Sequence, residues 1–208
     1  MHDDKNIHGK IRLEHVISFA DAIFAFSITF MAISIQIPNL PDNNITQTEL
    51  IAKLLELRPQ FETYVISFFI IGIYWISYHQ VFNNITGSHA IMIWLNLLFL
   101  FFITLISFAT GLQINYGLYH IIFIIYALIL IITGSLLASI WLHAKKNNLI
   151  DKSLSRIQTR NIFLQSLLPP TAFAISILIS FVNIQIAYYF WMTIIPGKII
   201  LRKISYPY

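Results

Sequence analysis

Residues 17–38 read ISFADAIFAFSITFMAISIQIP, an apolar run in which Asp21 is the single acid. A helix needs about 20 apolar residues to cross a bilayer core about 30 Å thick, so this run is predicted to be a transmembrane helix. Lipid does not solvate a carboxylate, and an unpaired one is energetically costly. Asp21 must therefore meet hydrogen-bond donors or water, and this need restricts how the helix can be oriented.

The whole chain has the composition of an integral membrane protein. Of its 208 residues, 57% are hydrophobic and 11% are charged, against about 25% charged residues in soluble domains. A soluble fold of this size cannot bury so much apolar surface. The absence of cysteine excludes disulfides and thiolate metal sites. The net charge of +4 is better explained by membrane topology than by a nucleic-acid partner.

Six segments are long and apolar enough to cross a membrane, so we predict an all-α membrane protein with a single domain over residues 1–208. The runs are too long for membrane strands and lack their alternation. Pro169 and Pro170 lie near the start of the fifth segment, where they are expected to mark a helix entry or a local break, and Pro196 lies in the sixth. The predicted spans are about 16–37, 64–82, 90–112, 118–142, 164–184 and 185–201.

The basic residues predict the orientation of these spans. With six spans, the two termini and the connections after the second and fourth spans lie on one side of the membrane. All but two of the 13 Lys and Arg residues fall on that side, the exceptions being Lys53 and Arg58. Because basic segments are retained in the cytoplasm, both termini are predicted to be cytoplasmic.

The connection between the first two spans is a long polar insert. Within it, Thr46 precedes Glu49 by three residues, a spacing typical of a capping box at the start of a helix. We expect a short helix there, packed on the bundle at the membrane interface through leucines such as Leu50 and Leu54.

Three predicted helices bring polar side chains to the depth of Asp21. Trp75 and His79 lie near the cytoplasmic end of the second span, and Asn96 lies near that of the third. An indole, an imidazole and an amide can all donate hydrogen bonds to a carboxylate. We interpret these residues as a structural polar network within one subunit.

Two alternative interpretations use some of the same residues. Intramembrane ionisable pairs often mark proton pathways, so Asp21 and His79 could instead form a proton relay or a substrate site. A metal site built from His15, His79 and His89 has less support, because no cysteine or carboxylate ligand lies at a recognisable spacing.

Helical geometry separates Asp21 from Phe26. At 100° per residue, the five residues between them correspond to a rotation of about 140°. The side of Phe26 also carries Ala22, Thr29, Ile33 and Gln36. This line is either a helix-packing stripe, with Thr29 bonded to its own backbone, or a pore lining whose bulky apolar residues block ions by dewetting. From the residues alone, the packing stripe is favoured.

Three stretches resemble, in order, the signatures of the transmembrane protein 175 family of potassium channels. FADAIFAFSIT (Phe19–Thr29) resembles the first-helix signature, commonly Arg-x-x-x-Phe-Ser-Asp followed by an apolar helix. SFFIIGIYWISYHQVF (Ser67–Phe82) is similar to a Ser-Phe…Tyr-Trp…His pattern, and LNLLFLFFITLISFATGL (Leu95–Leu112) to a Leu-Asn-Leu…Pro-Phe segment. The resemblance extends weakly through the last three spans.

The resemblance implies a potassium-preferring cation channel without a selectivity-filter re-entrant loop, and no TVGYG-like stretch occurs here. In the family the first helix lines the pore. The implied constriction is Phe26 and the implied selectivity residue is Thr29, with Ala22 and Ile33 on the same line. A six-span chain would form a homotetramer in the cell membrane, or in an endosomal or lysosomal membrane of a eukaryote. K+ would be the permeant ion, and neither a cofactor nor an enzymatic activity is implied.

The sequence departs from the family pattern at several positions. Ala20 replaces the motif serine, and His15 stands at the usual arginine position, with Arg12 one turn earlier. Arg12 and His15 are therefore included in the predicted polar network. Ser107 stands where the family often has proline, and Phe26 is larger than the usual Ile or Leu. Walker, HExxH and nucleophile-elbow motifs are absent from the sequence, which agrees with a protein that is not an enzyme.

Overall fold

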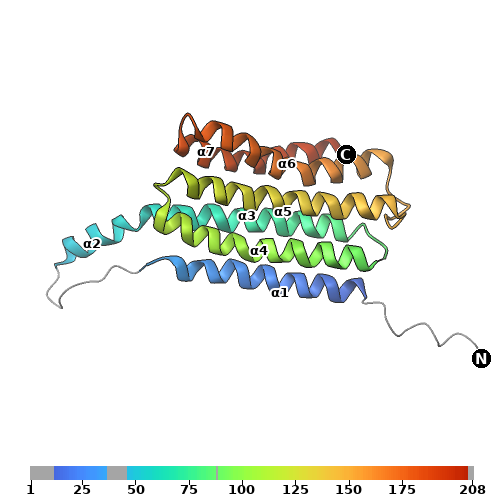
Figure 1. Cartoon of the computed structure of the whole chain (residues 1–208), viewed down its shortest axis with the longest axis horizontal. Coiled ribbons are helices and arrows are strands. Elements are labelled where there is room, and N and C mark those ends of the chain that lie inside the picture. The colour runs from blue at the N-terminus through green and yellow to red at the C-terminus, as the bar shows by residue number, and fades with distance from the viewer. Residues whose placement is uncertain (1–11, 37–45, 88, 206–208) are drawn as a thin grey trace, which may run out of the picture.

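A computed structural model describes residues 12–36, 46–87 and 89–205, and its long helices lie side by side in one bundle (Figure 1). Six segments of the described chain are long and apolar enough to cross a membrane. The predicted all-helical class with six spans is therefore confirmed. The helices are α1 (Leu13–Met31), α2 (Gln47–Glu56), α3 (Arg58–Phe82), α4 (Ala90–Tyr116), α5 (His120–Lys146), α6 (Arg156–Ser180), α7 (Ile184–Phe190) and α8 (Ile194–Ser205), with 3-10 turns η1 (Ala32–Ser34) and η2 (Trp191–Thr193).

The first helix lies at one edge of this bundle. It packs on α4 and α3, while α5 packs between α4 and α6, and α7 and α8 pack on α6. Figure 1 shows α1 and the α6–α7 pair at opposite edges, with α3, α4 and α5 between them. One side of α1 therefore faces away from the rest of the chain.

Aromatic side chains fill the core on both sides of α5. On the α1 side, Phe24 contacts the ring of Tyr78 edge-on, with centroids 5.7 Å apart, and Tyr78 stacks on Phe99 at 5.6 Å. On the α6 side, the buried Trp191 ring stacks on Phe123 with centroids 5.3 Å apart. These rings supply much of the apolar area through which the helices contact one another.

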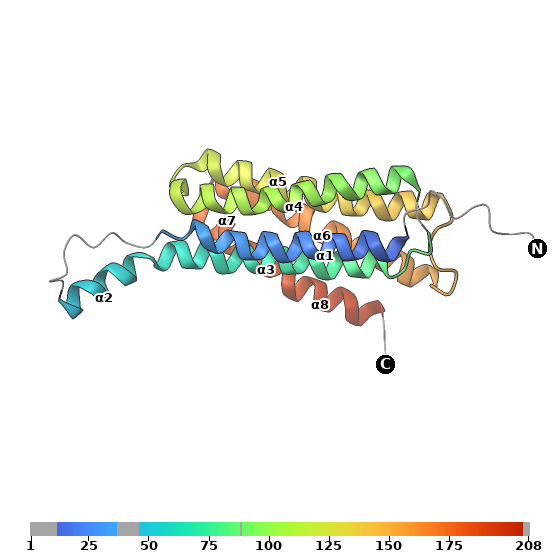
Figure 2. The same ribbon diagram turned by 90° about the horizontal axis from the view of Figure 1, so that it is seen from below.

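The helix expected in the first outer connection is confirmed as α2. Thr46 caps it with both hydrogen bonds of a capping box, and the bonds from its backbone N–H and hydroxyl lower the pKa of Glu49. The expected packing on the bundle is wrong, because none of the residues of α2 is buried and Leu54 is 52% exposed. The reason is that α3 begins at Arg58, directly after Leu57, so that α2 extends beyond the bundle end (Figure 2).

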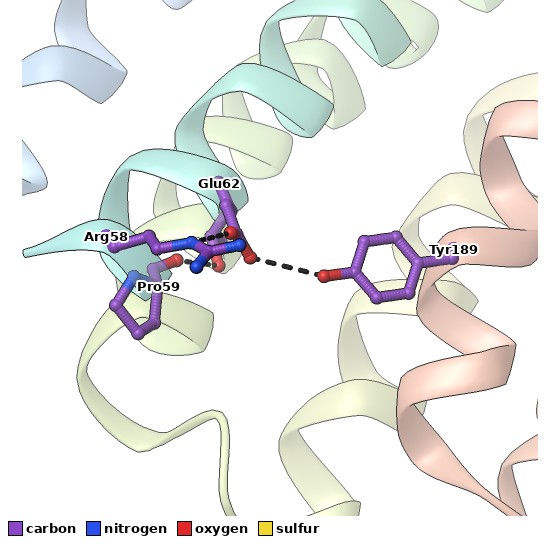
Figure 3. Close-up of polar contacts among 5 residues, drawn as sticks. Arg58, Pro59, Glu62 and Tyr189 are labelled. Atoms are coloured by element: carbon purple, nitrogen blue, oxygen red, sulfur yellow. Dashed lines mark hydrogen bonds and ion pairs between the residues drawn. The ribbon is translucent and has the colours of Figure 1, made fainter.

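The start of α3 is tied to α7 at the same end of the bundle. Arg58 Nε donates to Glu62 Oε1 at 2.7 Å, and the Tyr189 hydroxyl donates to Glu62 Oε2 at 3.2 Å (Figure 3). Glu62 thus joins two helices that are far apart in sequence.

The fifth span differs from its predicted range of 164–184. Helix α6 begins at Arg156, because Ser155 caps it with a capping box to Gln158. It also continues through Pro169 and Pro170, both buried, rather than beginning or breaking there. Packing explains this tolerance, since the Pro170 ring fills the space beside Gly134 of α5.

The sixth span, predicted as 185–201, is not one continuous α-helix. It consists of α7, the 3-10 turn η2 and α8. Pro196 lacks an N–H for the carbonyl of Met192, and its ring crowds that carbonyl, so the regular hydrogen-bond pattern cannot run through this region. The first four predicted ranges overlap α1, α3, α4 and α5, with ends that differ by a few residues.

Close packing of α5 on α6 gives the first prediction. A Cβ atom at Gly134 would lie 2.6 Å from Pro170 Cδ, whereas a Cβ at Gly72 of α3 would have nothing within 4 Å. Overpacking costs about 1–3 kcal/mol, so Gly134→Ala should lower the free energy of unfolding by about that amount, measured in mixed micelles. Gly72→Ala is the matched control and should be neutral or slightly stabilising, because alanine favours helix. Equal stability of the two variants would contradict the packing described here.

Candidate functional site

The Asp21 carboxylate is bonded to two donors from α3. Asp21 Oδ1 lies 2.8 Å from Trp75 Nε1 and 2.8 Å from His79 Nε2. Trp75 and His79 are one turn apart on α3, and their rings contact edge-to-face with centroids 4.8 Å apart. An ionised carboxylate can only accept hydrogen bonds, and in this arrangement the donor is the N–H of His79 in the tautomer that carries its hydrogen on Nε2. The structure thus brings together these three predicted residues of the polar network.

This cluster is open to its surroundings on one side. The side chain of Asp21 is 43% exposed and that of His79 is 25% exposed. Both bonds to Asp21 come from the same chain, so the acid does not require another subunit for a partner.

The other three residues predicted for the network lie elsewhere. Asn96 is 2% exposed and makes no hydrogen bond to Asp21, because its side chain faces the core side of α4. Arg12 Nη2 lies 3.2 Å from His15 Nε2, so these two residues contact each other rather than Asp21. Their position one turn and more before Asp21 places them at the exposed end of α1.

Sequence reasoning missed a second contact that holds α1. The Ser107 hydroxyl of α4 donates to the Ser27 backbone carbonyl at 2.8 Å. Ser107 stands at a position where proline was expected, and a proline there could not make this bond. The available signal was a hydroxyl residue at the position where the resemblance implies proline.

Helix α1 buries one face and leaves the opposite face exposed. The buried residues recur every three or four positions and include Ala20 and Phe24; the set is Val16, Ala20, Phe24, Ser27 and Met31. The predicted line of Ala22, Phe26, Thr29, Ile33 and Gln36 is exposed along its whole length. Phe26 is 59% exposed and Ile33 is 75% exposed. From Ala22 to Ile33 this line therefore does not pack on the described helices of its own chain, whereas the bond from Thr29 to its own backbone, expected with a packing stripe, is present.

The side chains on this line adopt defined positions. Phe26 stacks on Phe30 with ring centroids 5.5 Å apart. The Thr29 hydroxyl donates to the backbone carbonyls of Ala25 and Phe26, each at 3.0 Å. The hydroxyl hydrogen is thereby directed into the helix, and the oxygen lone pairs remain on the exposed side.

Hydrogen bonds also fix the chain just after the C-terminal end of α1. Gln36 Nε2 donates to Asn115 Oδ1 at 2.7 Å, and the Gln36 backbone N–H donates to Gln60 Oε1 at 3.1 Å. The exposed line is therefore held between the Asp21 contacts at one end and these contacts at the other.

A metal site has no geometric support in the part of the chain that the structure describes. Three or more His, Asp or Glu side chains do not gather there as metal ligands would. Of the histidines considered, His79 contacts Asp21, and His89 lies beside His143 with ring centroids 6.5 Å apart.

Comparisons with known proteins agree on one family. The family model described as endosomal/lysosomal potassium channel TMEM175 matches residues 15–106, which contain the Asp21 cluster and the exposed line. A protein from Streptomyces collinus named as a potassium channel is 24% identical over 171 residues, covering 80% of this chain and 81% of that protein. The zebrafish (Danio rerio) protein named as endosomal/lysosomal proton channel TMEM175 is 31% identical, over 51% of this chain and 20% of its own length.

A solved structure shares the fold. The crystal structure described as a lysosomal potassium-selective channel TMEM175 homolog from Chamaesiphon minutus matches with a TM-score of 0.76 and 22% identity. The match covers 93% of this chain and 97% of that chain, so it includes all six spans.

The contacts of Asp21 give the second prediction. Asp21→Asn replaces charge-assisted bonds with neutral ones, which are about half as strong. Because the site is partly exposed, the free energy of unfolding should fall by about 1 kcal/mol. The matched control is Glu14→Gln, which also replaces a carboxylate by its amide. Because Glu14 is an exposed acid of the same helix, this change should hardly alter the free energy of unfolding. Equal losses in the two variants would show that Asp21 does not anchor α1.

Proposed function

We propose that this chain, which belongs to the TMEM175 family, forms a homotetrameric, potassium-preferring cation channel whose pore is lined by α1. The observation that carries the proposal is the exposed line of α1, because it combines a large aromatic ring with a hydroxyl, and because its residues from Ala22 to Ile33 are left exposed by the described part of the chain. The protein is a multi-pass protein of the cell membrane. We further propose that residues 1–208 form one channel domain with both termini in the cytoplasm.

The position of α1 supports the proposed assembly into a tetramer. The helix lies at the edge of the bundle, so its exposed side can face another subunit but cannot enclose a path by itself (Figure 1). Closed symmetric rings are the common form of homo-oligomers. Four copies arranged around one axis would surround a path with four Phe26 rings and four Thr29 hydroxyls.

Conduction would depend on the order of the side chains along that path. Phe26 is large and apolar, and a ring of such residues excludes water and raises the barrier for a hydrated ion. Thr29 lies one turn further along α1. Since its hydrogen is donated to the backbone, its oxygen is free to accept a cation and replace part of the water that the ion loses. On either side of this region, the small side chain of Ala22 would leave the path wider, and Ile33 would form its apolar limit.

The channel would carry K+ passively, with no cofactor and no covalent chemistry. The alternative is a proton channel or a proton-coupled transporter that uses Asp21 and His79. One contact supports this alternative, since His79 Nε2 lies 2.8 Å from the partly exposed carboxylate of Asp21. The zebrafish relative is also named as a proton channel.

Ion flux separates these functions and is the third prediction. Reconstituted into liposomes, the chain should pass K+ down its gradient in the absence of a pH gradient. His79→Gln should leave K+ flux within about twofold, because the imidazole lies outside the proposed path. Flux that requires a pH gradient and disappears in His79→Gln would instead establish the proton mechanism.

The constriction gives the fourth prediction. Phe26→Ala removes the bulk that closes the neck, and a barrier lowered by about 1.4 kcal/mol raises a rate about tenfold. We therefore expect K+ leak through Phe26→Ala to rise by about tenfold or more in the same liposomes. Phe108→Ala on α4 is the matched control, since Phe108 is 60% exposed and Phe26 is 59% exposed. Similar leak through both variants would place the constriction elsewhere.

A further inference from the structure

A cavity of about 420 Å³ lies between α3, α6 and α8, and none of its lining residues belongs to α1. Figure 2 shows α8 beside α3, diverging from the other helices toward its C-terminal end. Four isoleucines form the apolar part of the cavity wall, namely Ile73, Ile76, Ile195 and Ile199. The volume lies in the range of sites that bind small molecules.

Three side chains with N–H donors, those of Lys198, Gln165 and Gln80, line this cavity. The Lys198 ammonium donates to the hydroxyl of Ser77, which in turn donates to the Ile73 carbonyl at 2.6 Å. An ammonium carries three N–H groups, so this bond uses only one of them. Gln165 is 4% exposed, and its Nε2 has no hydrogen-bond partner within the described residues.

The cavity has a positive charge and no matching negative charge. The ion pairs formed within the described ranges involve Lys53, Arg58 and His79, and none includes Lys198. A cation left uncompensated between apolar walls is costly, and so is a buried amide without a partner. Both costs are removed by one ligand oxygen that carries negative charge.

The position of the cavity indicates what else the ligand contains. Ile76 is 57% exposed and Ile199 is 53% exposed, although both lie in segments apolar enough to span the membrane. Their exposed surfaces therefore face acyl chains. An amphiphile in the leaflet can place an acyl chain on these surfaces and its charged group at Lys198, which a soluble anion cannot do.

We propose that this cavity binds an anionic amphiphile, with its oxyanion on Lys198 and Gln165 and its acyl chain along the four isoleucines. A phospholipid phosphate and a fatty-acid carboxylate share this chemistry. The bound molecule joins α8 to α3 and α6. Binding does not depend on whether the chain conducts K+, so it can be tested in protein that is not passing ions.

The test is a binding measurement on the full chain, delipidated in maltoside detergent. Dioleoylphosphatidylglycerol, ionised oleate, dioleoylphosphatidylcholine and methyl oleate are each titrated, and the unfolding temperature and native mass spectra are recorded. We expect at least one of the two anionic probes to raise the unfolding temperature by several degrees and to form a one-to-one complex. A response to oleate alone identifies a fatty acid as the ligand, and a response to phosphatidylglycerol alone identifies a phospholipid. No response, or equal responses to the charged and uncharged probes, overturns the proposal.

Variants locate the binding to this cavity. Lys198→Met keeps the length of the side chain and should weaken binding of the anionic probe at least tenfold, whereas Lys198→Arg should retain it. Gln165→Leu should also weaken binding, and it carries the test if Lys198→Met does not fold. Lys203→Met removes an exposed charge from the same helix and should bind as the unchanged chain does. Unaltered binding in both Lys198→Met and Gln165→Leu places the amphiphile elsewhere and overturns the proposal.

Discussion

The structure depends on the hydrogen bonds that a carboxylate requires inside an apolar helix. Asp21 meets that requirement by facing α3, where Trp75 and His79 donate to it. Because a helix is rigid, this contact sets the rotation of the whole of α1. The buried residues from Val16 to Met31 then follow on the packed side of the helix. The residues on the opposite side, from Ala22 to Ile33 along the exposed line, are left exposed by the described part of the chain.

This rotation connects a stability feature with a functional one. The residues that anchor α1 and the residues proposed to line the pore alternate along the same short sequence, so neither set can move without the other. Two further hydrogen bonds reinforce the arrangement. Ser107 binds the middle of α1 at Ser27, and Gln36, just after the C-terminal end of the helix, binds Asn115. A ring of Phe26 side chains can only close a path if each ring is held in place. The hydrogen bonds of Asp21 are therefore part of what would make a narrow apolar constriction reproducible from one subunit to the next.

The sequence predicts the number of membrane spans and their helical class well, because span length is set by bilayer thickness. The angle around the helix axis between Asp21 and Phe26 could also be calculated, since it depends only on the helical repeat. Features decided by tertiary packing could not be calculated. Continuation of α6 through Pro169 and Pro170 depends on the space beside Gly134. The predicted place of Asn96 beside Asp21 was wrong, because depth in the membrane does not specify the direction of a side chain. Equally, the sequence alone could not show that Phe26, Thr29 and Ile33 stay exposed in the described part of the chain.

Two ionisable side chains of the spans, Asp21 and Lys198, are stabilised in different ways. Asp21 has two donors from a neighbouring helix, so its charge is stabilised by the fold itself. Lys198 has a neutral hydroxyl and an adjacent amide that lacks a partner. A cation in apolar surroundings is stabilised far less by a hydroxyl than by an anion. The fold therefore completes the first site and leaves the second to be completed from the membrane, which is why the contact between α8 and α3 should depend on the lipid around the protein whereas the rotation of α1 should not.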